Sequence, residues 1–508
     1  MTFKKILIAN RGEIALRIQR ACRELGIATV ALYSDADRAA LHVLEADEAY
    51  RLGPSPALES YLRGDLILNI ARKSGAQAIH PGYGFLSENA DFAQACENTG
   101  IKFIGPSSSA MRMLGSKTRA REAADAAGMP RTPGSTKALA SLDEAFAVAA
   151  QVKYPVMLKA AAGGGGKGMR AVSRREDLAS AFEAAQSEAE RAFGSSEVYI
   201  EKLIEQPRHV EIQIIADEHG NCVALGEREC SVQRRHQKVI EEAPSAVVNE
   251  DLRHRMGEAA VRLAKSAGYT NAGTVEFLLD SHRNFYFLEM NTRLQVEHPV
   301  TELVTGFDLV HLQIRIAQGE SLPFTQEDIH LRGHAIECRI YAEDPDNGFL
   351  PSPGRITRLL QPGGPGIRED CGIYEDWVVP MDYDPLLSKL IAYAPTREMA
   401  IARLSRALSE YVIGGIRTNL GLFQRILDDK DFRQAHIDTG YLDRLLTQPK
   451  TARPSHGAEQ AALLAAAIFE SMKSTGEQSV KTNGARAKDQ DVAAHGWKAL
   501  GRRDGLRA

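Results

Sequence analysis

The chain has 508 residues, enough for about three domains with buried cores. Hydrophobic residues make up 44% and charged residues 25% of it, which is typical of a globular protein. The formal net charge of −4 gives no reason to expect a nucleic acid or an anionic membrane as a partner.

The spacing of the cysteines and the sequence at the two ends of the chain further restrict the class of protein that we expect. The six cysteines show no CxxC spacing, so neither a zinc site nor a disulfide framework is indicated, and they fit a reducing cytoplasm. The amino terminus enters a short strand directly, so we expect no secretory signal. The longest apolar run near the other end, Ala461–Phe469, is too short to span a bilayer.

Residues 1–114 alternate between strand and helix patterns and predict an open α/β domain. Lys5–Ala9 and Thr29–Tyr33 are predicted strands, and a helical pattern between them ends at Gly26. The loop HPGYGFLSEN follows the strand Ala78–His80. Loops at strand ends of such sheets commonly form sites, so Tyr83 is a candidate binding residue, although a simple tight turn explains the sequence equally well.

Residues 115–333 contain a glycine run, within a lid predicted at about 131–203. Gly163, Gly165 and Gly168 match the dinucleotide pattern GxGxxG, but a strand-like segment follows them instead of a helix. The phosphate pattern GxxxxGK[ST] fails because Met169 follows Gly168. We therefore expect a glycine-rich hairpin whose amides cover polyphosphate, with charge from Lys159 and Lys167; the alternative is a surface hairpin without a ligand.

A helix is predicted after this hairpin, from a capping box of Ser173 and Glu176 to about Phe193. Beyond it, the segment RHVEIQIIAD alternates, with His209, Glu211 and Gln213 on one face of a half-buried strand.

The basic segment CSVQRRHQKVIEEAP comes next. If it is extended, Gln233, Arg235 and Gln237 share one face, and Arg234, His236 and Lys238 share the other. A solvated basic loop is the alternative.

Two strands, Thr274–Leu279 and Phe285–Met290, flank a polar turn and predict a β-hairpin. Symmetry about the bond between residues 282 and 283 places Glu276 opposite Glu289. Their repulsion would cost about 3 kcal/mol at an effective dielectric near 20, so a cation is expected between them. Such oxygen ligands suit Mg²⁺ or Mn²⁺ bound together with nucleotide phosphates.

An unusual polar row continues this hairpin if the chain stays extended. The same face then carries Asn291, Arg293, Gln295 and Glu297. The row offers metal ligands, then groups that hold a small anion, then a carboxylate that accepts a proton. An exposed edge strand with mixed polar residues is the alternative.

Residues 334–446 contain short strands separated by Pro and Gly, which predict a mostly antiparallel sheet. Two helical stretches, Arg397–Tyr411 and Asn419–Leu427, close it. Residues 447–508 form a predicted flexible tail with one helix, Glu459–Lys473. The fold class is therefore a combination of α/β and α+β.

Nine motifs in series resemble the biotin carboxylases of the ATP-grasp superfamily, across about residues 1–446. They are IANRGEIALRI, HPGYGFLSEN, KAAAGGGGKGMR, PRHVEIQ, ERECSVQRRHQKVIEEAP, AGTVEFL, FLEMNTRLQVEHPVTE, GHAIECRIYAEDP and PSPGRI. The resemblance implies an ATP-grasp central domain with a mobile lid. It also implies an ATP-dependent ligase in which bicarbonate is phosphorylated to carboxyphosphate, and biotin is then carboxylated on a ring nitrogen.

The resemblance assigns roles to residues at the matching positions. By similarity, ATP is held by Lys117, Lys159, His236, the glycines Gly163, Gly164, Gly165, Gly166 and Gly168, and Glu201, Lys202, Leu203, His209, Gln233 and Leu278. Two magnesium or manganese ions would bind Glu276, Glu289 and Asn291. Bicarbonate would bind Lys238, Arg293, Gln295 and Val296. Glu297 would be the base, Arg339 would stabilise the biotin enolate, and Tyr83 would line the biotin pocket.

The sequence of the tail differs from the carrier domain of larger relatives, in which the biotinylated lysine lies in an (A/S)MK motif. Lys473 lies in ESMK, but it ends an Ala-rich helix and lacks a surrounding β-sandwich, so we expect no biotin there. The resemblance implies a stand-alone subunit that acts on a separate biotin carboxyl carrier protein, beside a separate carboxyltransferase. It also implies a homodimer.

Three other functions are alternatives to biotin carboxylation. Another ATP-grasp ligase would couple a carboxylate to an amine without bicarbonate. A nucleotide-binding subunit without turnover would lack Glu276, Glu289 or Glu297, and all three are present. A nicotinamide dehydrogenase is disfavoured by the strand after the glycines. Acetyl-CoA, propionyl-CoA and pyruvate all stay open as the final carboxyl acceptor.

Overall fold

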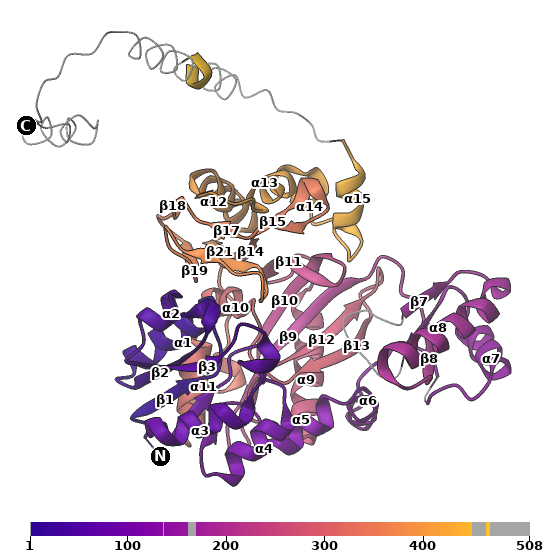
Figure 1. Ribbon diagram of the computed structural model, residues 1–508. Coiled ribbons are helices and arrows are strands. Elements are labelled where there is room, and N and C mark those ends of the chain that lie inside the picture. Colours follow the sequence, from indigo (N-terminus) through magenta and orange to yellow (C-terminus); the bar gives the residue numbers. More distant parts are fainter. Residues whose placement is uncertain (1, 136, 161–168, 450–463, 468–508) are drawn as a thin grey trace, which may run out of the picture. The chain divides into compact units, whose positions relative to one another are not determined.

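Elements of the first 114 residues build a parallel sheet covered by helices on both faces (Figure 1). The computed structural model describes residues 2–135, 137–160, 169–449 and 464–467. Within them the sheet order is β3-β2-β1-β4-β5. The elements are β1 (Lys5–Ile8), α1 (Gly12–Glu24), β2 (Ala28–Ser34), α2 (Leu41–Leu44), β3 (Glu48–Gly53), the 3₁₀ turn η2 (Ala57–Glu59), α3 (Gly64–Ser74), β4 (Ala78–His80), α4 (Ala90–Asn98), β5 (Lys102–Phe103) and α5 (Ser108–Leu114).

Burial on both faces explains the uninterrupted apolar run of β1. Ile6 and Ile8 pack with α1 in one hydrophobic cluster, whereas Leu7 packs in the cluster of α3 and α4 on the opposite face. A strand between two helical layers has no solvent side, so its pattern does not alternate. The predicted open α/β domain is thus confirmed.

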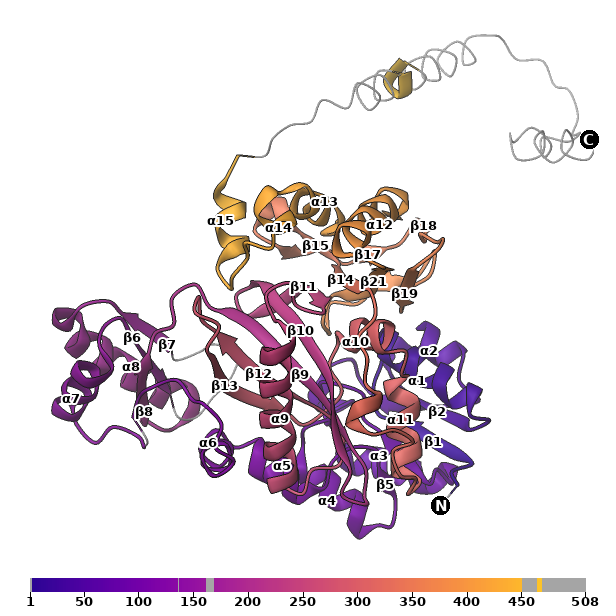
Figure 2. The ribbon, with the colours of Figure 1, turned by 180° about the vertical axis from the view of Figure 1, so that it is seen from behind.

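A long sheet joins the central and carboxyl-terminal regions (Figures 1 and 2). Within the described residues its strand order is β13-β12-β9-β10-β11-β14-β21-β19. Its strands and the helices near them are β9 (Arg208–Ala216), β10 (Cys222–Arg234), β11 (Gln237–Ala243), α9 (Glu250–Ser266), β12 (Asn271–Leu279), β13 (Phe285–Asn291), α10 (His298–Thr305), α11 (Leu309–Ala317), β14 (His334–Tyr341), β19 (Ile367–Cys371) and β21 (Leu386–Ala394).

Helix α9 covers one face of this sheet. It packs on Val210, Ile212 and Ile214 of β9, and these three residues point away from His209, Glu211 and Gln213 as the alternation predicts. The polar face is nevertheless buried as well, so the expectation of a half-buried strand is wrong. Glu211 and Gln213 have no exposed surface, which means that their charges and dipoles must be satisfied inside the protein.

The remaining carboxyl-terminal elements lie around β14 and β21. They are β15 (Glu343–Asp344), β16 (Leu350–Pro351), β17 (Gly354–Arg355), β18 (Arg358–Leu360), β20 (Val378–Val379), α12 (Arg397–Glu410), β22 (Val412–Gly414), α13 (Leu420–Asp428), α14 (Lys430–Arg433) and α15 (Tyr441–Thr447). The two predicted helices are present as α12 and α13. The predicted tail helix falls largely outside the described residues, of which 464–467 are helical, and Lys473 lies outside them.

A separate three-stranded sheet, β7-β6-β8 within the described residues, lies in the segment predicted to be the lid. Its elements, with the helix before it, are α6 (Lys117–Ala126), α7 (Leu142–Val152), β6 (Val156–Ala160), β7 (Met169–Val172), α8 (Leu178–Phe193) and β8 (Val198–Lys202). The capping box of Ser173 and Glu176 is wrong: a 3₁₀ turn occupies Arg175–Asp177, and the α-helix begins at Leu178.

The hairpin β12–β13 places Glu276 opposite Glu289, as predicted. The register is not uniform, however, because it shifts by one residue between Glu276 and Phe277. Phe277 therefore faces Phe287, where uniform symmetry would give Leu288. This bulge lies beside the two carboxylates. β-Bulges are common next to functional sites.

A second hairpin corrects the prediction for the basic segment. β10 and β11 are joined at Arg235 and His236, both of which have positive φ angles. Gln233 and Lys238 are cross-strand partners. Cross-strand partners lie on the same face of a sheet, so the predicted opposite faces are wrong.

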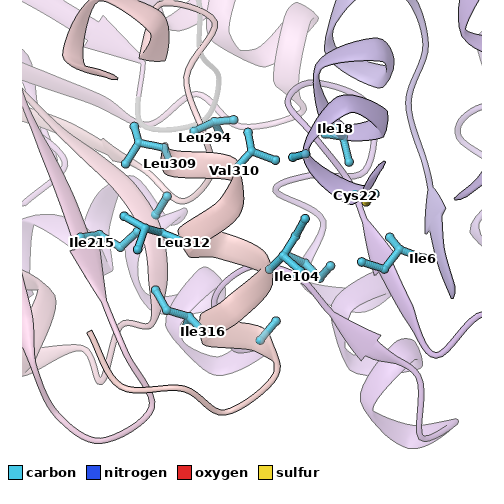
Figure 3. Close-up of a cluster of buried hydrophobic side chains, with 14 of the residues drawn as sticks. Ile6, Ile18, Cys22, Ile104, Ile215, Leu294, Leu309, Val310, Leu312 and Ile316 are labelled. Atoms are coloured by element: carbon cyan, nitrogen blue, oxygen red, sulfur yellow. The ribbon is translucent and has the colours of Figure 1, made fainter. Parts of the chain in front are cut away.

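Helix α11 connects the parallel sheet to the long sheet (Figure 3). Its apolar residues Leu309, Val310, Leu312 and Ile316 pack in one cluster with Ile6 and Ile18 from the first region and Ile215 of β9. This shared core fixes the Tyr83 loop relative to the central strands.

A buried ion pair reinforces that junction. Glu302 of α10 accepts hydrogen bonds from Arg17 of α1 at 2.9 Å and from Arg368 of β19 at 2.7 Å. Burial alone would raise the pKa of Glu302, but Arg17, His298 and Arg368 lower it to about 2. The group is therefore ionised in the folded protein, and it links three regions of the chain.

Glu302→Gln should lower the free energy of unfolding by about 3 kcal/mol at pH 7, because Arg17 and Arg368 each lose one of two carboxylate partners and keep only Asp308 and Asp370. Since the folded-state pKa is depressed, the contribution of Glu302 is complete above about pH 4.5 and is lost as the pH falls toward 2. Urea unfolding midpoints at several pH values measure the difference. The exposed Glu410, paired with Arg406, gives the control Glu410→Gln. A difference from wild type that stays constant between pH 7 and pH 3 would contradict the assignment.

Candidate active site

The ammonium group of Lys238, on β11, lies at the centre of three buried carboxylates. Its Nζ is 2.6 Å from Glu211 Oε2, 2.9 Å from Glu276 Oε1 and 2.7 Å from Glu297 Oε1. Glu211 and Glu276 are direct cross-strand partners on β9 and β12. Like charges in this position repel, so the arrangement depends on the cations among them.

A fully buried guanidinium lies beneath this group. Arg228 of β10 donates to Glu211 Oε1 at 2.5 Å and to the side chains of Gln213, Thr301 and Thr274 at 2.7–3.1 Å. Every one of these partners is buried. Arg228 thereby compensates Glu211 and leaves Lys238 to be shared with Glu276 and Glu297.

Glu297 also faces the carboxyl-terminal strands. Arg339 of β14 lies 2.9 Å from Glu297 Oε2, and its Nε donates to Glu241 Oε1 at 2.6 Å. Burial alone would raise the pKa of Glu297, but Lys238, Arg339 and Arg228 hold it well below its usual value. Glu297 is therefore ionised, and its two oxygens are paired with two cations.

Two other buried carboxyl groups lie behind Arg339. Glu241 and Glu337 are cross-strand partners on β11 and β14. Burial raises the pKa of Glu241 to about 7, despite its ion pair with Arg339. The pKa of Glu337 is also raised well above its usual value, chiefly by burial. Such a pair retains a proton near neutral pH, which limits the negative charge that competes for Arg339.

The predicted polar row beyond β13 does come together, but not as an extended strand. Arg293 donates to Gln295 Oε1 at 2.7 Å and to Asn291 Oδ1 at 3.0 Å, and Nε donates to Glu88 at 3.0 Å. Strand β13 ends at Asn291, and Glu297 is the residue that precedes α10. The extended geometry is therefore wrong, and a loop held by Arg293 places these side chains at the site.

A cavity of about 490 Å³ opens beside Arg339. Tyr83, Arg293 and Val296, all predicted from the sequence, lie on its wall. The phenol of Tyr83 donates a hydrogen bond to Glu13 of α1. The cavity is thus enclosed by all three main regions of the chain, and its wall carries both cations and aromatic surface.

Lys389 supports this wall from behind. It has no exposed surface, and its Nζ donates to the carbonyl of Val296 at 2.8 Å and lies 3.3 Å from Glu13 Oε1. Its position next to Val296 fixes the backbone that leads into Glu297. The sequence signal for this residue, which the predictions did not use, is a single lysine in the apolar run LLSKLIAYA.

Residues expected to hold ATP are only partly brought together. Lys159 of β6 lies 2.6 Å from Glu201 of β8, and Arg121 also pairs with Glu201. His209 contacts Glu276 at 3.0 Å, and Leu278 is the cross-strand partner of His209. Gly163, Gly164, Gly165, Gly166, Lys167 and Gly168 lie outside the described residues, as does the side chain of Lys117.

Other predicted nucleotide residues lie around this position. His236 is exposed at the β10–β11 turn, and Gln233 is buried on β10. Lys202 donates to the carbonyls of Lys153 and Tyr154, each at 3.0 Å. Leu203 is half-buried and its amide bonds to Pro155 O at 3.0 Å.

The carboxylate and amide oxygens near Glu276 are suitable ligands for a divalent cation. Glu276 is buried, the facing Glu289 is exposed, and Asn291 donates to Glu276 Oε1 at 2.9 Å. Carboxylate and amide oxygens are the ligands that Mg²⁺ and Mn²⁺ prefer. Lys238 and His209 now compensate the charge of Glu276, and their attraction outweighs burial, so the pKa of Glu276 is lowered overall.

Sequence reasoning missed several residues of the site. Arg228, Glu241, Glu88 and Lys389 act through contacts between strands or regions that are distant in sequence. Glu211 was placed on the correct polar face but given no role. Its signal was the strict alternation of β9, which carries three polar residues on a face that proves to be buried.

Family models match almost the whole described chain. The biotin carboxylase N-terminal domain matches residues 2–111, the carbamoyl-phosphate synthase L chain ATP-binding domain matches 116–325, and the biotin carboxylase C-terminal domain matches 337–444.

Curated relatives cover the same part of the chain. A biotin carboxylase of Nostoc sp. is 55% identical over 445 residues, which is 88% of this chain and 100% of the relative. A pyruvate carboxylase subunit from Methanothermobacter thermautotrophicus is 54% identical, over 87% of this chain and 90% of the relative.

Solved structures agree with the fold. The biotin carboxylase domain dimer of the Hydrogenobacter thermophilus 2-oxoglutarate carboxylase, in complex with MgADP, ADP and bicarbonate, has a TM-score of 0.83 at 48% identity, covering 89% of this chain and 100% of that chain. The Campylobacter jejuni biotin carboxylase in its β-γ-ATP complex has a TM-score of 0.84 at 48% identity, covering 87% and 99%. The chain therefore belongs to the biotin carboxylase family, with an ATP-grasp central domain.

Proposed function

We propose that the protein is an ATP-dependent ligase that uses bicarbonate to carboxylate biotin on a separate carrier protein. The observation that carries this proposal is the position of Glu297 between Lys238 and Arg339, next to the cavity lined by Tyr83 and Val296. One carboxylate thus adjoins a cation suited to a small anion and another suited to an oxyanion on a larger substrate.

In the first step, Lys238, Arg293, Gln295 and the Val296 segment hold bicarbonate, and Glu297 removes its proton. The resulting oxygen attacks the γ-phosphorus of ATP, forming carboxyphosphate and releasing ADP. Glu276, Glu289 and Asn291 would hold magnesium or manganese, which would offset the charge of the transferring phosphoryl group. Lys159, His209, Gln233, His236 and Leu278 contribute to the nucleotide site, together with Lys117, Glu201, Lys202, Leu203 and the glycine segment.

Substrates make Glu297 a better base. Its pKa is low because Lys238 and Arg339 both pair with it, and a carboxylate so stabilised accepts a proton weakly. When bicarbonate and phosphate oxygens accept hydrogen bonds from Lys238, Glu297 loses part of this stabilisation. Burial, which raises the pKa of Glu297, is then opposed less strongly, so binding of the anions prepares the base.

In the second step, carboxyphosphate breaks down to CO₂ and phosphate. A ring nitrogen of biotin transfers its proton to the released phosphate and takes up the CO₂. Arg339 stabilises the oxyanion of the deprotonated biotin ring. Glu241 holds the guanidinium in place, and Tyr83 supports the ring of the substrate.

The resemblance to stand-alone relatives supports a wider assignment. We infer domains at 1–114, 115–333 and 334–446, a tail at 447–508, a homodimer, and a biotin carboxyl carrier protein and carboxyltransferase as partners. The final acceptor is an acyl-CoA, such as acetyl-CoA or propionyl-CoA, or pyruvate. No helix among the described residues is long and apolar enough to cross a membrane, and we propose a cytoplasmic location.

Glu297→Gln should lower bicarbonate-dependent ADP release at least 100-fold, because it removes the proton acceptor while keeping the shape of the side chain. Nucleotide affinity should change little, since the contacts of Glu297 are to Lys238, Arg339 and Cys230. Steady-state rates and calorimetric MgADP binding measure the two effects. The control is Glu258→Gln on the exposed side of α9. Turnover within a few fold of wild type would remove Glu297 as the base.

Arg339→Met should separate the two steps. Slow bicarbonate-dependent ATP hydrolysis without biotin should persist, whereas carboxylation of free biotin should fall about 100-fold, because the biotin oxyanion loses its charged partner. Release of ADP and fixation of labelled bicarbonate into biotin report the two activities. Equal loss of both would contradict a role confined to the biotin step, provided that the unfolding midpoint matches that of wild type.

A further inference from the structure

Two large apolar side chains project into solvent beside the 490 Å³ cavity. Leu58 is 78% exposed and Met381 is 77% exposed. Ala57, which precedes Leu58, and Asp382, which follows Met381, both line the cavity. Leu58 and Met381 are therefore each one residue from the lining of the same cavity, although more than 300 residues separate them in the sequence.

The segment that carries Leu58 is stiff. It reads Pro54-Ser55-Pro56-Ala57-Leu58, in which both prolines are exposed and Ala57 begins the 3₁₀ turn η2. Proline fixes its own φ angle, so few backbone states compete with the observed one. An exposed apolar side chain on such a segment is already held in its binding position.

One tyrosine ties both segments together. The hydroxyl of Tyr383 is 2.5 Å from the carbonyl of Ser55 and 2.5 Å from Ser34 Oγ. Its ring packs edge-on against Tyr61 and beneath the guanidinium of Arg11, 4.3 Å from the ring centroid. Met381 thus lies two residues before a fixed anchor, and its position relative to Leu58 is set by the fold.

We propose that Leu58 and Met381, together with Pro54 and Pro56, form the surface on which the folded carrier protein docks while its biotin occupies the cavity. We call these four residues the docking rim. The inference rests on the proposed function, and it assigns the partner's contact surface, which the chemistry of the cavity does not specify.

The position of the rim favours a carrier over a second copy of this chain. A substrate attached to a protein enters the cavity only if that protein lies against its border, where the rim is exposed. A permanent partner on the rim would cover the border and exclude the substrate. Two apolar anchors on a small surface suit the weak, short-lived complex that a shuttling carrier requires. By complementarity, the carrier presents apolar side chains next to its biotinylated lysine.

The test compares two substrates of one site, free biotin and a purified biotinylated carrier domain. The double variant Leu58→Ser/Met381→Ser should lower kcat/KM for the carrier domain at least tenfold, since two apolar contacts are lost. Its kcat/KM for free biotin should stay within about twofold of wild type, because neither residue lines the cavity.

Leu44→Ser/Leu350→Ser is the matched control. These leucines are 62% and 63% exposed and do not line the cavity, so both substrates should react as with wild type. Equal loss with both substrates, or an unchanged rate with the carrier, overturns the docking rim. A change of oligomeric state in sedimentation velocity, seen with the double variant alone, assigns the surface to a second copy and also overturns it. If wild type carboxylates neither substrate, the proposed function fails instead.

Discussion

The structure depends on one ammonium group that three buried carboxylates share. The three are Glu211, Glu276 and Glu297. Glu211 on β9 is the cross-strand partner of Glu276 on β12, which in turn faces Glu289 on β13. Glu297 approaches Glu211 and Glu276 from the loop before α10. Without Lys238 and Arg228, this row of like charges would destabilise the sheet. With them, Glu211, Glu276 and Glu297 are each paired with a buried cation. The same contacts predict what the site binds: anions that compete for Lys238 and cations that compete for Glu276.

The surrounding fold keeps this arrangement in place from three directions. The first region contributes Glu13 and Glu88, which hold Tyr83 and Arg293, and the carboxyl-terminal strands contribute Arg339 and Lys389. Because β11 pairs with β14, Lys238 and Arg339 belong to one continuous sheet, although about 100 residues separate them. Long-range pairing thus sets the spacing between Lys238, the proposed ligand of bicarbonate, and Arg339, the proposed ligand of biotin.

Local patterns predicted most of the elements and part of the site. Apolar runs and turn residues identified β1, α1, α12 and the β12–β13 hairpin, because these elements are determined by short-range periodicity. The opposition of Glu276 and Glu289 followed from hairpin symmetry and is confirmed. Errors arose where a tertiary contact overrides the local pattern. The loop after Asn291 is held by Arg293, the β10–β11 turn reverses the chain at Arg235 and His236, and α8 starts after a 3₁₀ turn. Glu241 and Lys389 could not be predicted, since their importance comes from strands paired far apart in sequence.

We propose that Glu276 changes its partner from Lys238 to a divalent cation when nucleotide and bicarbonate bind. Anomalous diffraction from crystals grown with Mn²⁺, a non-hydrolysable ATP analogue and bicarbonate tests it most directly. We predict a manganese peak within bonding distance of the carboxylates of Glu276 and Glu289, with Lys238 Nζ displaced from Glu276 toward the bound bicarbonate. Nucleotide density with no metal between these two carboxylates, and an unbroken pair of Lys238 and Glu276, would contradict the account.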